Sequence, residues 1–441
     1  MRRYDVDWLR VMALGLLIIY HIAVTFQPWA YFIAFIQSQK SLEFIWIFMG
    51  LINIWRIPLL FIISGMGVCF AMKSRNWKAL LKDRTKRILL PLIFGSLFIV
   101  PIQFIIFQSF NNMELAYWPT AAHLWFLENI LWYVILLCPI IYYLKNHPNN
   151  FLFRSLNKIL TQPFALYIIT IPFILEAELM VGPWDDFSTY AGTSHGYLLG
   201  IMTFFTGFIF ISIGNLFWRS VEKIKKVSLI IAIILYIIRL LIFELKSPTF
   251  LIVIESWSWL FSIFGFGSIF LNRQSSLLQY LSKAVYPVYI LHMVFMNLAA
   301  YLVLTQPLRT DYIYTVERVE KNSVAQEVGL IAGDKILNPD WKSFAPNASI
   351  TLLVLRGEDV EQLSLLCNSE GKIGADINIF TPAMVPKFAP SDISKFWIFG
   401  KFILMILLTF SGSILCYEHI IKRVKWLRPL FGLKIKNRRL I

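Results

Sequence analysis

The sequence predicts an all-α polytopic membrane protein of about ten transmembrane helices, with a small β-rich extracytoplasmic insert. Composition is the first indication, because 58% of the 441 residues are hydrophobic and 15% are charged, whereas soluble proteins average about 45–50% apolar and about 25% charged residues. The second indication is that apolar runs of roughly 20 residues, the length that crosses a bilayer, recur along the chain. The third is that the net charge of +15 comes mainly from short basic segments between these runs, which is typical of membrane topology and argues against nucleic-acid binding.

Ten apolar runs are predicted as membrane-spanning helices. They comprise residues 11–33, 45–72, 88–108, 123–144, 163–181, 196–217, 227–245, 250–271, 284–305 and 396–417. The first run continues to Ile36 without a small-residue cleavage pattern. We therefore interpret it as a retained signal anchor rather than a cleaved signal peptide.

The distribution of Lys and Arg predicts the orientation of the chain. With a cytoplasmic N-terminus, the segments on the cytoplasmic side hold 27 Lys and Arg residues, while the short loops on the other side hold only Lys40 and Lys246. Cytoplasmic loops carry an excess of these residues in membrane proteins. Both termini are therefore predicted inside, and we expect a multi-pass protein of the cell membrane, the inner membrane in a bacterium.

A change in composition divides the chain into three parts. Residues 1–305 form a transmembrane core with nine spans, 306–395 form an extracytoplasmic insert, and 396–441 contain the last span and a basic cytoplasmic tail. In the insert, two alternating runs rich in β-branched residues flank a Gly-Asp turn, a pattern that indicates strands.

The middle of this insert resembles a PDZ domain. The resemblance rests on the turn formed by Gly329, Leu330, Gly333, Asp334 and Ile336. Two features of that family are missing. Only about a dozen residues separate Ile336 from the next strand at Ile350, too few for the helix that walls the peptide groove, and no glycine-rich loop precedes Tyr312. We therefore expect a truncated PDZ-like insert that does not bind peptide C-termini.

His21 is the strongest catalytic candidate among the ionisable residues of the spans, where burial of such groups costs a few kcal/mol or more. It follows Arg10 by eleven positions, so the two lie roughly 16 Å apart on nearly the same face of one helix. An imidazole deep in apolar surroundings stays neutral and can accept a proton near neutral pH. The alternative is a packing histidine that bonds to a neighbouring helix.

Arg84 and Arg87 form a second candidate group at the entrance of the third predicted span. Residues at i and i+3 share a helix face, and two guanidinium groups there suit phosphate oxygens. The ordinary positive-inside distribution is the alternative explanation for this basic segment.

Two further histidines complete the candidate set. His123 opens the fourth predicted span, with Glu128 about 8 Å deeper by helix rise, and His292 lies about ten ångströms into the ninth span. Three histidines and a glutamate from different helices could thus converge on one site. For His123, an interfacial role beside Trp125 is the alternative.

Several motifs in order along the chain resemble the acyltransferase-3 superfamily of membrane enzymes. The motifs are Arg10-x10-His21, RIPLLFIISG from Arg56, RTKR from Arg84, HLWFL from His123 and YPVYILH ending at His292. The closest resemblance is to the branch that includes the succinyltransferases of periplasmic glucans. It implies transfer of an acyl group, acetyl or succinyl, from cytoplasmic acyl-CoA to a hydroxyl of an extracytoplasmic carbohydrate or glycan.

The resemblance also implies roles for the candidate residues. His21 would be the base, Arg10 would support the donor, and Arg84 and Arg87 would contact the donor's phosphates. His123 and His292 would be further active-site residues, and Glu128 is kept as a candidate beside them. The expected partners are acyl-CoA as donor substrate, a hydroxyl acceptor and the lipid bilayer. No permanently bound cofactor or metal is expected, since the cysteines form no CxxC pair.

The chemistry expected from these residues is direct transfer in a ternary complex, and a route through an acyl-histidine stays open. Two other functions are compatible with the composition. A transporter or flippase would explain buried charges in ten spans, although such proteins are often built from repeated halves and no internal repeat is visible here. A membrane adaptor would act through the insert at 306–395.

Overall fold

The computed structural model describes residues 2–38, 40–72, 76–182, 185–304, 308–337, 344–356, 359–386 and 395–433. The chain forms two compact units. One contains Met1–Leu304 together with Ser394–Ile441, and the other contains Thr305–Ile393. The end of the predicted basic tail, residues 434–441, lies outside the described residues.

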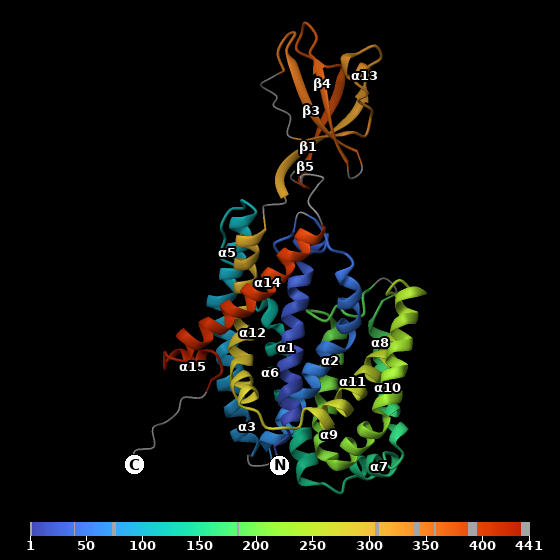
Figure 1. Ribbon diagram of the computed structural model, residues 1–441, viewed down its shortest axis with the longest axis vertical. Helices are drawn as coiled ribbons and strands as arrows, with labels where there is room; N and C mark the ends of the chain where they lie inside the picture. The colour runs from blue at the N-terminus through green and yellow to red at the C-terminus, as the bar shows by residue number, and fades with distance from the viewer. Residues whose placement is uncertain are drawn as a thin grey trace. The chain divides into compact units, whose positions relative to one another are not determined.

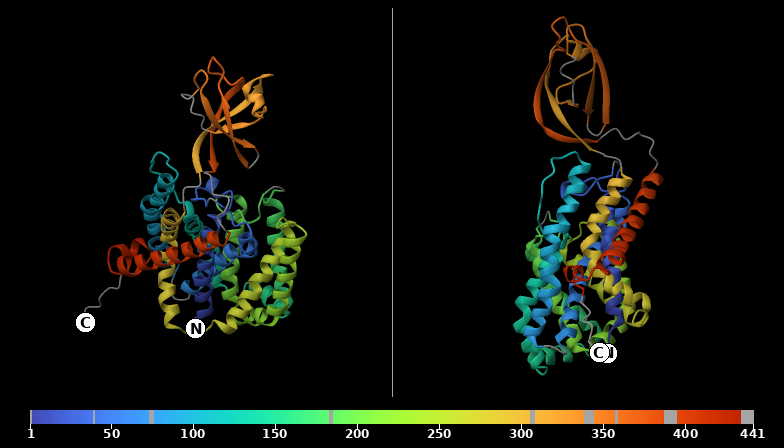
Figure 2. Two further views of the ribbon diagram at one scale, coloured as in Figure 1. Left: turned by 45° about the horizontal axis from the view of Figure 1, so that its top comes forward. Right: turned by 90° about the vertical axis from the view of Figure 1, so that its left-hand side faces the viewer.

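The first unit is helical (Figures 1 and 2). Its long helices are α1 (Tyr4–Val24), α2 (Ile45–Met72), α6 (Trp125–Asn146), α9 (Ser194–Ile213), α10 (Asn215–Leu241), α11 (Thr249–Phe270), α12 (Ser276–Val303) and α14 (Lys395–Cys416). Shorter elements are α7 (Phe151–Ile159), α8 (Thr170–Met180), which follows a 3-10 segment at Pro163–Ile169, and α15 (Leu427–Leu430).

A further long helix runs without a break from Trp77 to Phe110. It consists of α3 (Trp77–Arg84), α4 (Leu90–Phe94) and α5 (Val100–Phe110), joined by π-helical turns at Thr85–Leu89 and Gly95–Ile99. Single π-turns inside α-helices are rare overall. Where they occur, they are frequently found at functional sites. The first of these turns directly follows Arg84.

In the part of the chain that the structure describes, nine helices are long and apolar enough to cross a membrane. This finding confirms a multi-pass membrane protein. The predicted span 227–245, the seventh of the ten, falls on α10, which starts at Asn215 and so includes the basic residues predicted to lie in the preceding loop. Because of these charges, α10 is not among the nine apolar helices. It nevertheless packs lengthwise against α11, which is one of them (Figure 1).

The first predicted span, 11–33, is misplaced. The helix starts at Tyr4 and ends at Val24, and Ala30–Ile33 forms a separate 3-10 turn. Acidic side chains in the first turn, including Asp7, favour an early helix start, and Pro28 disfavours helical geometry at the residue before it. His21 therefore lies in the last turn of the helix instead of near the middle of a longer one.

Helices α2 and α9 approach closely through glycines. A β-carbon at Gly65 would lie 1.8 Å from the backbone oxygen of Phe204, and one at Gly207 would lie 2.0 Å from the oxygen of Ile62. Such contacts exclude any larger residue, so small residues set the spacing of these two helices. Gly65, the last residue of the RIPLLFIISG motif, thus has a packing reason to be glycine.

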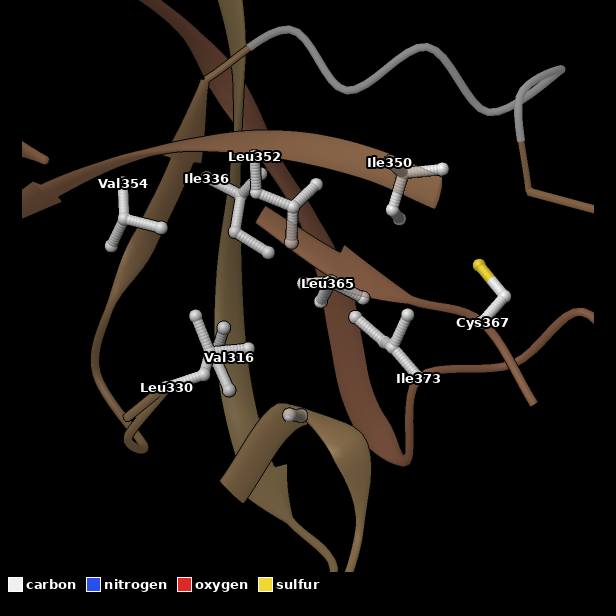
Figure 3. Close-up of a cluster of buried hydrophobic side chains, with 10 residues drawn as sticks. Val316, Leu330, Ile336, Ile350, Leu352, Val354, Leu365, Cys367 and Ile373 are labelled. Carbon is white, nitrogen blue, oxygen red and sulfur yellow. The ribbon is translucent and has the colours of Figure 1, made fainter. Parts of the chain in front are cut away.

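The second unit is a five-stranded antiparallel sheet of strand order β4-β3-β2-β1-β5. The strands are β1 (Leu308–Val319), β2 (Lys335–Leu337), β3 (Ser349–Arg356), β4 (Asp359–Leu366) and β5 (Ala375–Pro386), with a short helix α13 (Val324–Glu327). Its core gathers alternate residues of β3, namely Ile350, Leu352 and Val354, around Ile336 (Figure 3). The predicted β-rich insert is therefore present.

The Gly-Asp turn of the insert is held by an ion pair. Gly329 and Gly333 have φ angles of 80° and 95°, a region that glycine adopts at no steric cost. Arg356 donates to both carboxylate oxygens of Asp334, at 2.9 and 2.7 Å, and this hydrogen bonding lowers the pKa of Asp334. The prediction that no helix separates Ile336 from Ile350 falls partly on residues 338–343, outside the described residues.

Candidate active site

His21 and His292 meet where α1 packs against α12. The Nδ1 atom of His21 lies 3.0 Å from the Nε2 atom of His292, and the two rings are nearly parallel, with centroids 5.2 Å apart and an interplanar angle of 9°. His292 is fully buried. Two of the predicted site residues, 271 positions apart in the sequence, therefore form one hydrogen-bonded pair.

The hydrogen bonds of this pair define the tautomer of each ring. His292 Nδ1 lies 2.6 Å from the backbone oxygen of Tyr289, and a carbonyl oxygen can only accept, so this nitrogen carries the proton. In a neutral ring, the Nε2 atom of His292 then has a free lone pair and accepts the Nδ1 proton of His21. His21 Nε2 is left with its lone pair available as a base.

His123 approaches the same turn of α12 from another direction. It lies in a 3-10 turn, Ala122–Leu124, directly before α6, and its Nε2 atom lies 3.2 Å from the backbone oxygen of Ile290. Its ring is perpendicular to that of His292, with centroids 5.1 Å apart. The hydroxyl of Tyr289 donates to the backbone oxygen of His123. The three predicted histidines thus converge.

A cavity of about 410 Å³ opens beside this cluster, within the size range of small-molecule sites. Its walls come from α1, α2, the start of α6 and the segment before α9. They combine aromatic rings with a few polar groups, namely Leu17, Tyr20, His21, Trp29, Ile33, Trp46, Asn53, Arg56, Ile57, His123, Trp125, Phe126, Asp186, Ser188, Thr189, Tyr190, Ala191 and Tyr289. His21 and His123 line this cavity, whereas His292 supports His21 from behind.

Arg10 and Arg84 both lie near Gly67 in α2. Arg84 Nη2 lies 3.4 Å from the backbone oxygen of Gly67, and a β-carbon at Gly67 would lie 3.8 Å from Arg10 Nη2. Arg10 also forms a 3.7 Å ion pair with Asp7. Both guanidinium groups therefore lie near Gly67, and we call this pair of arginines the cation cluster; Arg10 is three turns of α1 away from His21.

Arg84 and Arg87 make different contacts. Arg87 forms a 3.0 Å ion pair with Asp83, while Arg84 points to α2. The π-helical turn that starts at Thr85 widens the helix between them and changes the angular relation that i and i+3 have in an α-helix. Arg84 thus shares a neighbour, Gly67, with Arg10.

Glu128 is exposed on α6 and does not line the cavity with the histidines. Two other ionisable residues of the spans, Arg239 and Glu255, pair with each other at 2.7 and 3.0 Å. Arg56 and Tyr289 belong to the site but are absent from the predicted site residues. Both lie within the motifs RIPLLFIISG and YPVYILH, which is the signal that could have identified them.

Fold and site together define a multi-pass membrane protein with a histidine cluster facing an internal cavity. Residues 3–317 match the acyltransferase-3 family model, which is described as an acyltransferase domain. Since this match covers more than half of the chain, the protein belongs to that family and is a membrane acyltransferase. Comparisons with curated proteins and with solved structures find no match.

Proposed function

We propose that the protein is an O-acyltransferase that moves an acetyl or succinyl group from cytoplasmic acyl-CoA to a hydroxyl of an extracytoplasmic glycan. The observation that carries the proposal is the chain of hydrogen bonds from Tyr289 through His292 to His21. It leaves a basic nitrogen at the wall of a cavity in a member of an acyltransferase family.

In the proposed reaction, His21 Nε2 removes the proton of the acceptor hydroxyl while the hydroxyl oxygen attacks the thioester carbonyl carbon. The carbon–sulfur bond then breaks, and the leaving thiolate takes the proton from the His21 imidazolium. His292 keeps the His21 Nδ1–H directed at an acceptor throughout, as the third member of a catalytic triad does. The products are the acylated hydroxyl and free coenzyme A.

The cation cluster at Gly67 suits the other end of the donor. Guanidinium groups bind phosphate oxygens with directed N–H bonds, and Arg10 and Arg84 offer two such groups from two helices. Arg10 stands roughly 16 Å from His21 by helix rise. This separation suits a donor whose phosphates and thioester lie at opposite ends of a long arm.

The aromatic wall of the cavity suits the acceptor. Tyr20 and Trp29 both pack against Trp46, with ring centroids 5.6 Å and 5.0 Å from that of Trp46. Such sites combine broad apolar surfaces with a few polar groups that fix orientation, which matches the apolar faces and hydroxyl edges of a sugar. Family membership favours this enzyme over the transporter that the composition also allows.

The test measures acyl incorporation into envelope glycans in membranes that carry wild-type protein or His21→Ala. We expect the substitution to abolish transfer while the protein level stays unchanged. His147→Ala is the matched control, because His147 is an exposed histidine at the end of α6 that does not line the cavity. Undiminished transfer by His21→Ala would rule out His21 as the base.

A further inference from the structure

Arg56 is a buried cation without a described counter-charge. It lies on α2 with 3% of its surface exposed and lines the same cavity as His21. Its Nε and Nη1 atoms have no hydrogen-bond partner. Among the described residues, no carboxylate forms an ion pair with it, and its guanidinium carbon lies 3.8 Å from the ring centroid of Tyr20.

Arg239 is a buried arginine with a structural role, and its hydrogen-bond partners can be compared with those of Arg56. Its guanidinium binds both carboxylate oxygens of Glu255 and donates to the backbone oxygen of Gly50 at 2.9 Å. A buried charge without such partners is strongly destabilising. The ring of Tyr20 compensates this cost for Arg56 only in part, since a cation–π contact is weaker than a hydrogen-bonded ion pair.

Asp186, the carboxylate that shares the cavity with Arg56, binds Ser188 through its Oδ1 atom and forms no ion pair with Arg56 among the described residues. Asp186 accepts hydrogen bonds from the backbone nitrogen and the hydroxyl of Ser188, at 2.8 and 2.6 Å, and Ser188 in turn accepts a bond from Asn53. This network ties the segment before α9 to α2. The Nε and Nη1 atoms of Arg56, which have no hydrogen-bond partner among the described residues, are therefore available to a molecule inside the cavity.

Arg56 is held in place by the backbone around Pro58. Proline cannot donate to the residue four positions earlier, so the backbone oxygen of Ile54 is left without its helical partner. The hydroxyls of Tyr190 and Ser256 bind this oxygen at 3.2 and 3.0 Å. Helix α2 is thus anchored on two sides next to Arg56, which favours a fixed position of the cation.

The place of Arg56 relative to His21 limits what can bind there. Its guanidinium carbon lies 3.8 Å from the centroid of the Tyr20 ring, and the centroids of the Tyr20 and His21 rings are 6.0 Å apart. The guanidinium carbon of Arg56 is therefore at most about 10 Å from the centroid of the His21 ring. Arg10 lies roughly three turns of α1 away from His21. An anion at Arg56 therefore belongs to the reacting end of a substrate and not to the donor's phosphates.

We propose that Arg56, stacked on Tyr20, binds a carboxylate of the substrate inside the His21 cavity. This inference rests on the proposed function only in one respect, namely that the bound substrate takes part in acyl transfer. The carboxylate belongs either to the distal end of a dicarboxylic acyl group or to an acidic sugar of the acceptor. In both cases the ion pair orients the substrate with its reacting atom toward His21.

The first experiment measures binding without catalysis. Thermal unfolding of the full-length protein in detergent is followed at constant ionic strength with succinate, glucuronate, phosphate or the neutral diamide succinamide. We expect a concentration-dependent rise in melting temperature with succinate or glucuronate but not with succinamide, and loss of this rise in Arg56→Met. Lys78→Met removes an exposed cation outside the cavity and should respond like wild type.

Without ligand, Arg56→Met should melt no lower than wild type, because it removes an unpaired buried charge. If this variant does not fold, Arg56→Gln is used in its place. No rise with either carboxylate in the wild type, an equal rise in the Arg56 variant, or an equal rise with phosphate would each overturn the proposal. A rise with succinate alone assigns the carboxylate to the acyl group, and one with glucuronate alone assigns it to the acceptor.

The second experiment compares succinyl-CoA with butyryl-CoA, whose acyl chain lacks the carboxylate, as donors. If the carboxylate is on the acyl group, Arg56→Met should lower kcat/KM for succinyl-CoA at least tenfold relative to butyryl-CoA. If it is on the acceptor, both donors should lose equally and KM for the acceptor should rise. Carboxylate binding without any acyl transfer would reject the proposed function alone, and transfer without carboxylate binding would reject the Arg56 site alone.

Discussion

The role of His292 can be tested apart from that of His21. His292 does not line the cavity, but its Nε2 atom lies 3.0 Å from His21 Nδ1. Replacement by Phe keeps an aromatic ring on α12 and removes this acceptor. The Nδ1–H of His21 then has no partner in the tautomer that the reaction needs, and the other tautomer places the proton on the nitrogen that must act as the base.

The expected loss follows from the cost of that unpaired donor. A buried N–H without a partner costs about 1–3 kcal/mol, and since each 1.36 kcal/mol is a factor of ten in rate, kcat should fall by about 5- to 160-fold. KM for donor and acceptor should change little, because the cavity wall is unchanged. His292→Gln offers an amide oxygen to the same nitrogen and should lose less activity than His292→Phe.

The assay is the initial rate of acyl transfer by purified protein at varied donor and acceptor concentrations. His147→Phe serves as the control for replacing a histidine of this membrane unit at a position away from the cavity. An unchanged kcat in His292→Phe would refute the reasoning, since it would show that the hydrogen bond to His21 does not select the reactive tautomer. A rise in KM at constant kcat would instead make His292 a part of the binding wall.

Three further predictions concern charged groups. Arg84→Ala should raise KM for acyl-CoA and leave kcat nearly unchanged in the same assay. An unchanged KM would show that Arg84 does not bind the donor and contributes only to the positive-inside distribution that orients the chain. Arg239→Met should lower the free energy of unfolding in detergent by about 3–5 kcal/mol because Glu255 remains buried and unpaired, and adding Glu255→Leu should restore most of it. The pKa of Asp334 is lowered by Arg356, so this pair stabilises the insert above the ordinary Asp pKa of about 3.9, and its contribution is lost as the pH falls through the lowered value. Hydrogen exchange of the insert in the full-length protein should show lower protection at pH 7 in Arg356→Gln, and a weaker change on acidification than in wild type.

Some helix ends could not be predicted from hydropathy. An apolar run marks where a helix can lie in the bilayer, but not where it begins. The helix of the first span extends into the polar residues before Val11, and α10 extends back through a basic segment to Asn215. In both places charged side chains are accommodated in the helix, as Arg10 is beside Asp7. The orientation of the chain stays a prediction.

The sequence by itself determined the membrane class, most of the spans and the β-rich character of the insert, although not all five of its strands. These features depend on the length of apolar runs and on alternation, which are properties of neighbouring residues. It also singled out His21, His123 and His292, because ionisable side chains are rare in such runs. Their order along the chain carried the resemblance to the family that the family match then confirmed.

Only the tertiary structure decided which of these side chains act on one another. His21 and His292 are 271 positions apart, and no spacing in a sequence encodes a contact between two helices at that separation. Arg56 and Arg239 are both arginines in apolar helices, yet packing places Glu255 beside one and a cavity beside the other. The physical reason is that the cost of a buried charge is set by its partners in space, and these come from other helices.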